Sequence, residues 1–154
     1  MQKKVSALIA VRSGSVRVKN KNIRTFNDST LLELKIKQLQ SVKEINDVVV
    51  NSNSDEMLSI AKNLGAKTVK RDDYYASNTI SMSSVFEHMA KNMDCENILY
   101  ANCTNPLVST NSYSDAIRIF LNNTSAYDSL VSCHDIKEFL YLDGKALNYD
   151  PMNQ

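Results

Sequence analysis

The chain has 154 residues, a formal net charge of +1, 43% hydrophobic and 23% charged side chains, which fits one soluble domain over residues 1–154. No apolar run approaches the ~20 residues of a membrane-spanning helix. The three cysteines, Cys95, Cys103 and Cys133, are too few and too widely spaced for a disulfide framework or a zinc site, so we expect a cytoplasmic protein with free thiols.

The first part of the chain predicts a strand, a helix and a second strand. Residues 5–11 form a short apolar, β-branched run, which is typical of a buried strand. Leucines and isoleucines then recur with helical spacing over residues 31–39, and Thr30 with Glu33 fits a capping box at the start of that helix. Residues 47–51 (DVVVN) read as the next buried strand.

The same alternation continues along the chain. Asn53 or Ser54 can cap a helix whose apolar residues lie between positions 57 and 64, and Gly65 suits its C-terminal end. The remaining predicted elements are a strand at 66–70, a polar loop at 71–80, a helix at 81–93, a strand at 97–103, a helix at 112–121, a strand at 129–133 and a hairpin at 139–149 with Asp143-Gly144 in its turn.

Alternating strands and helices of this length predict an α/β fold. We expect a Rossmann-like, mostly parallel sheet with helices on both faces. In such sheets ligands bind beyond the carboxyl ends of the strands. Residues 12–22, 71–80 and 102–110 each follow a predicted strand, so we expect these three segments to meet at one edge of the sheet.

Positive charge is concentrated near the start of the chain. Residues 1–27 contain no Asp or Glu and seven basic residues: Lys3, Lys4, Arg12, Arg17, Lys19, Lys21 and Arg24. Because the chain as a whole is near neutral, this cluster favours a local anion site such as a phosphate pocket. A nucleic-acid-binding surface is disfavoured, since no further basic stripe and no aromatic stacking pattern accompany the cluster.

The basic loop after the first strand, residues 12–22, lacks the glycines of known phosphate-binding loops. Gly14 stands alone, which excludes both the P-loop and the GxGxxG motif of dinucleotide folds. Side chains must therefore bind the anion, helped by backbone amides around residues 13–15. Arg12 can make forked contacts with phosphate and Lys21 can act as a point charge, whereas Arg17 and Lys19 have the simpler interpretation of solvated surface residues.

Several segments resemble the signatures of one enzyme family. The pattern A-x-R-S-G-S-x-x-x-x-N-K-N is made by Ala10, Arg12, Ser13, Gly14, Ser15, Asn20, Lys21 and Asn22. Further segments are RDDYYASNT at 71–79, NCTNPL at 102–107 and NYDPMNQ at the end of the chain. Together they resemble the cytidylyltransferases that activate acidic sugars, such as the acylneuraminate cytidylyltransferases and their relatives for 3-deoxy-manno-octulosonate, legionaminate and pseudaminate.

This resemblance implies a nucleotide-diphospho-sugar transferase fold and a set of site residues. Arg12 and Lys21 would be catalytic and hold the triphosphate of CTP, and Asn22 and Arg71 would contact the cytidine. The other nucleotide-binding candidates are Ala10, Ser13, Gly14, Ser15 and Ser81. Asn102 and Thr104 would face the acceptor sugar.

The resemblance also implies the reaction and its partners. The anomeric hydroxyl of an acidic 2-keto sugar would attack the α-phosphate of CTP and release pyrophosphate for surface-glycan synthesis, with Mg²⁺ bridging phosphates. Family domains run past residue 154 and carry their metal-binding aspartates there, so we expect a chain truncated at its C-terminus, which would be a homodimer at full length. We find no metal ligands within the 154 residues.

Departures from the family pattern leave the acceptor open. Asn78, Asn102, Cys103 and Val108 stand where the family has Asp, Gln, Pro and Arg, on the side expected to face the sugar. One alternative is the same fold with a phosphonate or a phospho-sugar as acceptor. Another is a truncated domain that binds a nucleotide without turnover.

Overall fold

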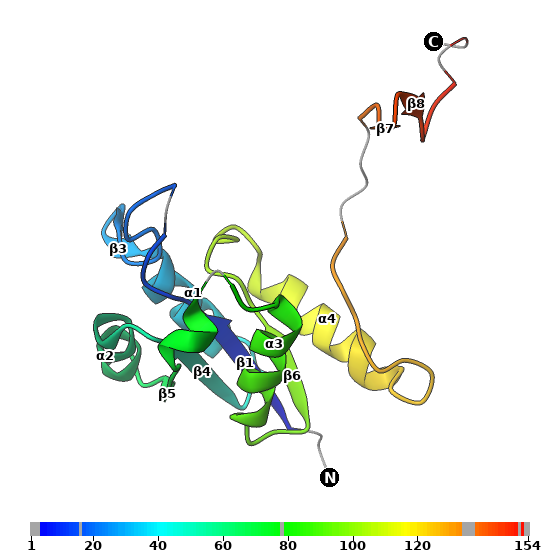
Figure 1. Ribbon diagram of the computed structural model, residues 1–154. Helices are drawn as coiled ribbons and strands as arrows, with labels where there is room; N and C mark the ends of the chain where they lie inside the picture. The colour runs from blue at the N-terminus through cyan, green and yellow to red at the C-terminus, as the bar shows by residue number, and fades with distance from the viewer. Residues whose placement is uncertain (1–3, 16, 78, 134–137, 151, 153–154) are drawn as a thin grey trace.

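The computed structural model describes residues 4–15, 17–77, 79–133, 138–150 and 152. Its centre is a four-stranded sheet in the order β5-β4-β1-β6, in which every pairing is parallel. The strands are β1 (Val5–Ala10), β4 (Asp47–Ser52), β5 (Lys67–Lys70) and β6 (Asn97–Tyr100). This confirms the predicted parallel sheet (Figure 1).

In the described part of the chain, four α-helices cover both faces of this sheet, as predicted. They are α1 (Leu31–Gln40), α2 (Asp55–Asn63), α3 (Met82–Lys91) and α4 (Thr110–Asn122). Side chains alternate along a strand, so Ala7 and Ile9 of β1 pack with α1, α2 and α4, whereas Leu8 packs with Val85 and Met89 of α3 on the other face. None of the helices described in the structure is long and apolar enough to cross a membrane.

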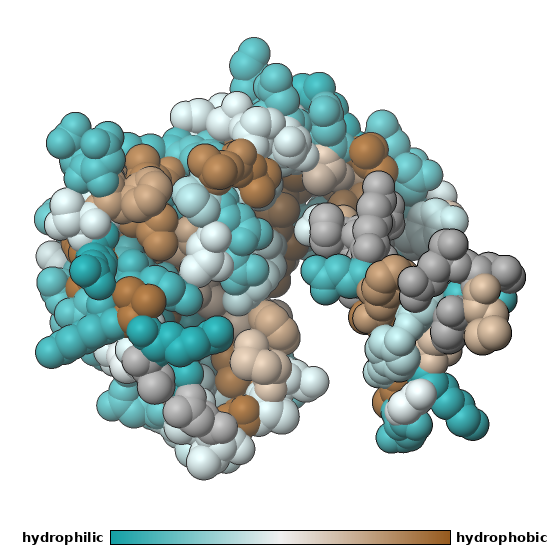
Figure 2. All heavy atoms as spheres, turned by 90° about the horizontal axis from the view of Figure 1, so that it is seen from above, coloured by the Kyte–Doolittle hydropathy of each residue, from teal (hydrophilic) through white to brown (hydrophobic). Residues whose placement is uncertain are grey.

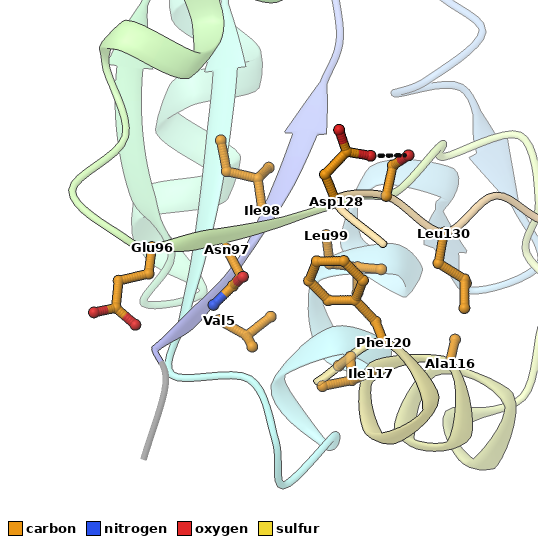
Figure 3. A pocket seen from close by; sticks show the side chains of 11 residues that line it. Val5, Glu96, Asn97, Ile98, Leu99, Ala116, Ile117, Phe120, Asp128 and Leu130 are labelled. Atoms are coloured by element: carbon orange, nitrogen blue, oxygen red, sulfur yellow. Dashed lines mark hydrogen bonds between the residues drawn. The ribbon is translucent and has the colours of Figure 1, made fainter. Parts of the chain in front are cut away.

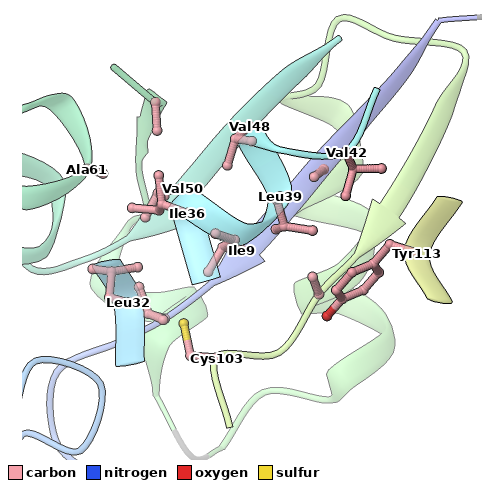
Figure 4. Packing of buried hydrophobic residues seen from close by; sticks show 14 of the residues in the cluster. Ile9, Leu32, Ile36, Leu39, Val42, Val48, Val50, Ala61, Cys103 and Tyr113 are labelled. Carbon is pink, nitrogen blue, oxygen red and sulfur yellow. The ribbon is translucent and has the colours of Figure 1, made fainter. Parts of the chain in front are cut away.

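The larger core lies between the sheet and α1. Leu32, Ile36 and Leu39 are completely buried and gather around Ile9 and Val50 of the two central strands (Figure 4). Their spacing of three and four residues places them on one face of the helix. This packing fixes α1 against the two central strands.

Local signals in the sequence set the helix boundaries. Thr30 caps α1 by accepting a hydrogen bond from the backbone N–H of Glu33 at 3.2 Å, while the Glu33 carboxylate accepts from Ser29 and not from Thr30. Ser54 caps α2, and Gly65 follows that helix with φ +76°, a conformation that costs glycine little.

The strand predicted at 129–133 is wrong. These residues pair with no strand in the described part of the chain, and Val131 is 79% exposed. Local composition favoured a strand there, but a strand forms only where a distant segment supplies a ladder partner. The strand predicted at 97–103 also ends earlier, at Tyr100.

Three small elements complete the description. The predicted hairpin forms from β7 (Tyr141–Leu142) and β8 (Lys145–Ala146), and Asp143 and Gly144 have φ of 49° and 76° as such a turn requires. It lies away from the sheet in Figure 1. Sequence reasoning missed the pair β2 (Thr25–Phe26) and β3 (Ser29–Thr30) and the 3₁₀ helix η1 (Asp73–Ala76) within the predicted loop.

Candidate active site

The three segments that follow β1, β5 and β6 meet at the carboxyl edge of the sheet, as predicted. Figure 2 views the molecule from this side and shows a mainly hydrophilic surface with separate hydrophobic patches. A cavity of about 680 Å³ opens here between the basic loop and the segment after β6. Its lining residues are Ala10, Val11, Arg12, Gly14, Ser15, Arg17, Val18, Lys21, Asn22, Asn102, Cys103 and Thr104. We call it the basic cavity.

The loop lining the basic cavity depends on residues that tolerate positive φ. Gly14 has φ +81° and Asn20 has φ 54°, values in the left-handed region that suit glycine and asparagine. The Asn20 carbonyl accepts hydrogen bonds from the N–H groups of Ile23 and Arg24, and the carbonyl of the buried Asn22 accepts from Leu32 at the start of α1. These bonds turn the chain so that Lys21 faces the cavity.

A second, narrower cavity of about 340 Å³ lies beside the first, between the sheet edge and α3. Apolar and aromatic side chains form most of its wall, among them Ile80, Val85 and Tyr100, and Arg71 supplies a positive charge. The lining is completed by Ala10, Val11, Arg12, Tyr75, Ser77, Met82 and Met89. We call it the aromatic cavity, and it shares Ala10, Val11 and Arg12 with the basic cavity.

Arg71 is held almost entirely by one residue, Asn51, at the end of β4. Its Nε donates to Asn51 Oδ1 at 2.6 Å and its Nη2 donates to the Asn51 carbonyl at 2.9 Å. The same carbonyl accepts from the N–H of Val11 at 3.1 Å. Arg71 is only 5% exposed, and this burial lowers the pKa of its guanidinium. A buried cation therefore lies in the wall of the aromatic cavity, supported by neutral acceptors.

Aromatic stacking positions Tyr75 in the same wall. Its ring stacks on His88 of α3 with centroids 3.8 Å apart and planes 12° from parallel. Burial raises the pKa of the neighbouring Tyr100 hydroxyl. The side chain of His88 thus anchors η1 against α3.

Arg12 lies where the two cavities meet. Its Nη1 donates to the carbonyl of Ala76 in η1, so the guanidinium bridges the basic loop and the segment after β5. Arg12 also lies near enough to Arg71 to lower that residue's pKa. Two guanidinium groups therefore lie near this junction, and Lys21 lines the basic cavity beside it, an arrangement that suits a ligand with several negative charges.

Comparison with known proteins identifies the family. The family model described as cytidylyltransferase matches residues 6–150. The chain belongs to the cytidylyltransferase family. This confirms the family that the four sequence segments resemble.

Relatives of this family carry names that refer to acidic sugars. The chain is 28% identical over 126 residues to a pseudaminic acid cytidylyltransferase of Campylobacter jejuni, covering 78% of this chain and 54% of that protein. It is 36% identical over 70 residues to a CMP-N,N'-diacetyllegionaminic acid synthase of Campylobacter jejuni, covering 46% of this chain and 30% of that protein. The chain thus spans at most about half the length of these curated relatives.

A solved structure supports the family fold. The cytidylyltransferase from Leptospira borgpetersenii superposes with a TM-score of 0.64 at 25% sequence identity, covering 79% of this chain and 50% of that one. The family's nucleotidyltransferase fold is therefore the fold of this chain.

The structure brings together most of the predicted site residues of this cytidylyltransferase family member. Ala10, Arg12, Gly14, Ser15, Lys21, Asn22, Asn102 and Thr104 line the basic cavity, and Arg71 lines the aromatic one. Ser13 and Ser81 line neither. Ser81 caps α3, where its hydroxyl accepts from the N–H of Ser84, while its neighbours Ile80 and Met82 face the aromatic cavity. Arg17, which sequence reasoning left as a solvated residue, does line the basic cavity.

Asn53 is a site residue that sequence reasoning treated only as a helix cap. Its Oδ1 accepts from the N–H of Ser13 at 3.1 Å, and its Nδ2 donates to Ser13 Oγ at 3.0 Å and to Asp73 Oδ1 at 2.9 Å. The side chain therefore ties the basic loop to η1. Its position directly after a strand was the signal available in the sequence.

Metal ligands for the expected Mg²⁺ do not come together in the part of the chain that the structure describes. No three His, Cys, Asp or Glu side chains among those residues cluster in a way that could hold a metal ion. Asp72 accepts a hydrogen bond from the N–H of Tyr74, and Asp73 accepts one from Asn53. Both carboxylates therefore stabilise the conformation of the segment after β5. We derive no catalytic step through a metal.

A further cavity, of about 320 Å³, lies at the open edge of β6 (Figure 3). Leu99, Ile117, Phe120 and Leu130 form its apolar wall. None of the predicted site residues lines it, and it lies beside Val5, at the start of β1 rather than at the carboxyl edge. The predicted site residues that line a cavity thus lie at the basic and aromatic cavities.

Proposed function

We propose that this chain forms the nucleotide-binding part of a cytidylyltransferase that transfers CMP from CTP to an acidic 2-keto sugar and releases pyrophosphate. The observation that carries the proposal is the junction of the two cavities at Ala10, Val11 and Arg12. One cavity is narrow, largely apolar and aromatic, which suits a base. The other is wide and basic, which suits a triphosphate and an acceptor.

In this proposal the base of CTP occupies the aromatic cavity. Arg71 donates to the polar edge of the base, and Asn51 fixes the direction of that guanidinium. Tyr75 and Tyr100 exclude water from the ring of the nucleotide. The triphosphate then passes Arg12 and extends over the basic loop toward Lys21.

The transfer step follows from these positions. The anomeric hydroxyl oxygen attacks the α-phosphorus of CTP, the bond from that phosphorus to the bridging oxygen breaks, and pyrophosphate leaves with the electron pair. The hydroxyl proton is released to solvent. Negative charge grows on the leaving group. This charge is stabilised by Arg12, which donates to the carbonyl of Ala76, and by Lys21, whose backbone lies between the hydrogen-bonded Asn20 and Asn22.

Support for an acidic sugar comes from the relatives, whose names refer to pseudaminic and legionaminic acids. The acceptor would lie against Asn102 and Thr104 on the opposite wall of the basic cavity. Basic side chains facing that wall also favour an acceptor that carries a carboxylate.

Pyrophosphate release tests the proposal. CTP, UTP and GTP are each incubated with a panel of 2-keto acid sugars, and we expect release with CTP and an acidic sugar. Arg12→Ala and Lys21→Ala should each reduce turnover by about 10²–10³-fold, the loss seen when one such electrostatic donor is removed.

Lys19→Ala provides the matched control, because Lys19 belongs to the same loop but does not line the cavity. It should retain turnover close to that of the unmodified protein. Near-normal pyrophosphate release by both Arg12→Ala and Lys21→Ala would contradict the proposal. CTP binding without release for any sugar would leave a nucleotide-binding domain.

A further inference from the structure

Lys35 is a fully buried cation that the proposed reaction does not use. It lies on α1 among the core leucines and isoleucines and is 1% exposed. Its ammonium makes no ion pair with any carboxylate in the described part of the chain. Burial lowers the pKa of this amine. An apolar side chain of similar size would cost less free energy to bury, so core packing alone does not account for a lysine here.

The ammonium of Lys35 makes three hydrogen bonds. Nζ donates to the carbonyl of Asn105 at 2.7 Å, to the hydroxyl of Tyr113 on α4 at 2.8 Å, and to Oε1 of Gln38 on its own helix at 2.5 Å. It also lies 5.1 Å from the centroid of the Tyr113 ring. All three of its N–H donors therefore have neutral partners, and two of those partners lie about seventy residues further along the chain.

Gln38 extends this contact along the segment that follows β6. Its Nε2 donates to the carbonyl of Val108 and, at 3.4 Å, to that of Pro106. Lys35 and Gln38 thus bind three carbonyls of residues 105–108 from the core side. The preceding residues of the same segment, Asn102, Cys103 and Thr104, line the basic cavity.

Cys103 shows how close this buried cation lies to the cavity wall. Its thiol is 3% exposed, and burial raises its pKa to about 12, while the nearby charges of Lys35 and Lys21 oppose that rise. Lys21 lines the basic cavity and Lys35 lies in the core. The wall formed by residues 102–104 therefore stands between two cations.

We propose that Lys35 is a positioning residue for the acceptor side of the site: by holding the carbonyls after β6 it sets how Asn102 and Thr104 face the basic cavity. The inference rests on the proposed function for the identity of the acceptor. The effect of Lys35 on the order of residues 102–108 is independent of that function and can be measured separately.

Kinetics with separate variation of the two substrates test the positioning role. Lys35→Met removes the ammonium and keeps a side chain of similar length. We expect the KM for the acceptor sugar to rise about tenfold or more, because hydrogen bonds to a charged group are lost, while the KM for CTP stays within about twofold. Lys37→Met is the matched control on the exposed face of the same helix, and it should leave both constants unchanged.

The reactivity of Cys103 gives a readout without turnover. In a Cys95→Ser, Cys133→Ser background, Cys103 is the one thiol left, and its reaction with Ellman's reagent is followed at neutral pH. Loss of a nearby cation by itself raises the thiol pKa and slows this reaction. A faster reaction in Lys35→Met than in Lys37→Met therefore reports that the segment has loosened, and it is the result we expect.

Three results would overturn the inference. These are an unchanged Cys103 rate, an unchanged acceptor KM, and an equal rise in the KM for CTP and for the acceptor. If the unmodified protein turns over no sugar, the proposed function fails, and the Cys103 rates alone then decide whether Lys35 orders residues 102–108. Tyr113→Phe removes one of the three acceptors while keeping Lys35, and an intermediate thiol rate is expected even if Lys35→Met does not fold.

Discussion

Three cations in or beside the candidate site donate hydrogen bonds to uncharged oxygen atoms. Arg12 donates to the carbonyl of Ala76, Arg71 to Asn51, and Lys35 to Asn105 and Tyr113. A carboxylate partner would neutralise such a group and weaken its attraction for phosphate. Neutral acceptors fix the geometry and leave the positive charge available to a ligand.

A substitution at Asn51 tests this idea for Arg71. Asn51→Leu keeps the size of the side chain but removes the acceptor at 2.6 Å from Arg71 Nε. We expect the free energy of unfolding to fall by about 1.5–3 kcal/mol, the usual value of a hydrogen bond to a charged group. Calorimetric titration should also show at least a tenfold weaker affinity for CTP, since a misdirected guanidinium costs ~1.4 kcal/mol or more.

Asn51→Asp is the control for that experiment. It keeps an oxygen at the same position and replaces the amide nitrogen, Asn51 Nδ2, which finds no partner among the described residues. The new carboxylate partly neutralises Arg71 but still directs its guanidinium, and in the proposed arrangement Arg71 contacts the uncharged base rather than the phosphates. The CTP affinity of this variant should therefore stay nearer to that of the unmodified protein than the affinity of the leucine variant does. Equal losses in both variants would show that the acceptor at position 51 does not direct Arg71.

The residue chemistry was only partly predictable from the sequence. Arg12 and Lys21 stand in a motif that is contiguous in the chain, so their type and spacing indicated phosphate. Asn51, Asn53 and Lys35 act on partners 20, 40 and 70 residues away. Nothing local in the sequence distinguishes such residues from ordinary strand, cap and helix positions.

At the scale of elements, helix caps and tight turns set where each loop begins. The cap of α2 is instructive because Ser54 and Asn53 divide two tasks. Ser54 accepts a hydrogen bond from the N–H of Met57 at the first turn of the helix. Asn53 lies before the helix, and its side chain donates hydrogen bonds to Ser13 and Asp73. One loop of two residues thus ends a strand, starts a helix and links two segments of the site.

Removing the cap should destabilise the fold without altering the site. Ser54→Ala loses the hydrogen bond to Met57 and should lower the free energy of unfolding by about 1 kcal/mol. The thermal midpoint should fall by about 2–4 °C for a chain of this size. Ser59→Ala is the matched control, because Ser59 is an exposed position inside the same helix where alanine is the better helix former. Equal shifts in the two variants would argue against the cap.

Elements with strong local signals, including the buried strands of the sheet, were predicted well, whereas residues 129–133 and the segment 73–76 were not. Neighbouring residues alone determine the helix caps at Thr30 and Ser54 and the turn at Asp143-Gly144. The apolar run at 129–133 has the composition of a strand but pairs with none in the described part of the chain. The 3₁₀ helix Asp73–Ala76 has only four residues, which is too few to show a repeating pattern of apolar side chains in the sequence.

On the scale of the whole molecule, the order β5-β4-β1-β6 places β1 between its neighbours and brings the loops after three strands to one edge. CTP that fills both cavities should stabilise the entire fold by mass action. At a concentration 100 times its dissociation constant the gain is about 2.7 kcal/mol, which corresponds to about 5–10 °C in the thermal midpoint.

Comparing CTP with CMP at the same concentration separates the two cavities. CMP lacks the β- and γ-phosphates and should raise the midpoint less. In Lys21→Ala the difference between the midpoint shifts caused by CTP and by CMP should become smaller, because the β- and γ-phosphates that cause this difference bind in the basic cavity. An equal shift for CTP and CMP in the unmodified protein would mean that the triphosphate makes no contact there.

The shared wall at Ala10, Val11 and Arg12 has a consequence for how substitutions combine. The Asn51 carbonyl accepts both the N–H of Val11 and the guanidinium of Arg71, so a shift of this backbone reaches both cavities. Effects of substitutions that do not share a partner usually add, whereas those within one network do not. A change at position 11 or 12 should therefore be non-additive with a change in either cavity, while Lys21 and Tyr75 should combine nearly additively. The contributions of the basic and the aromatic cavity to the free energy of binding are therefore independent only for substitutions that leave this shared wall unchanged.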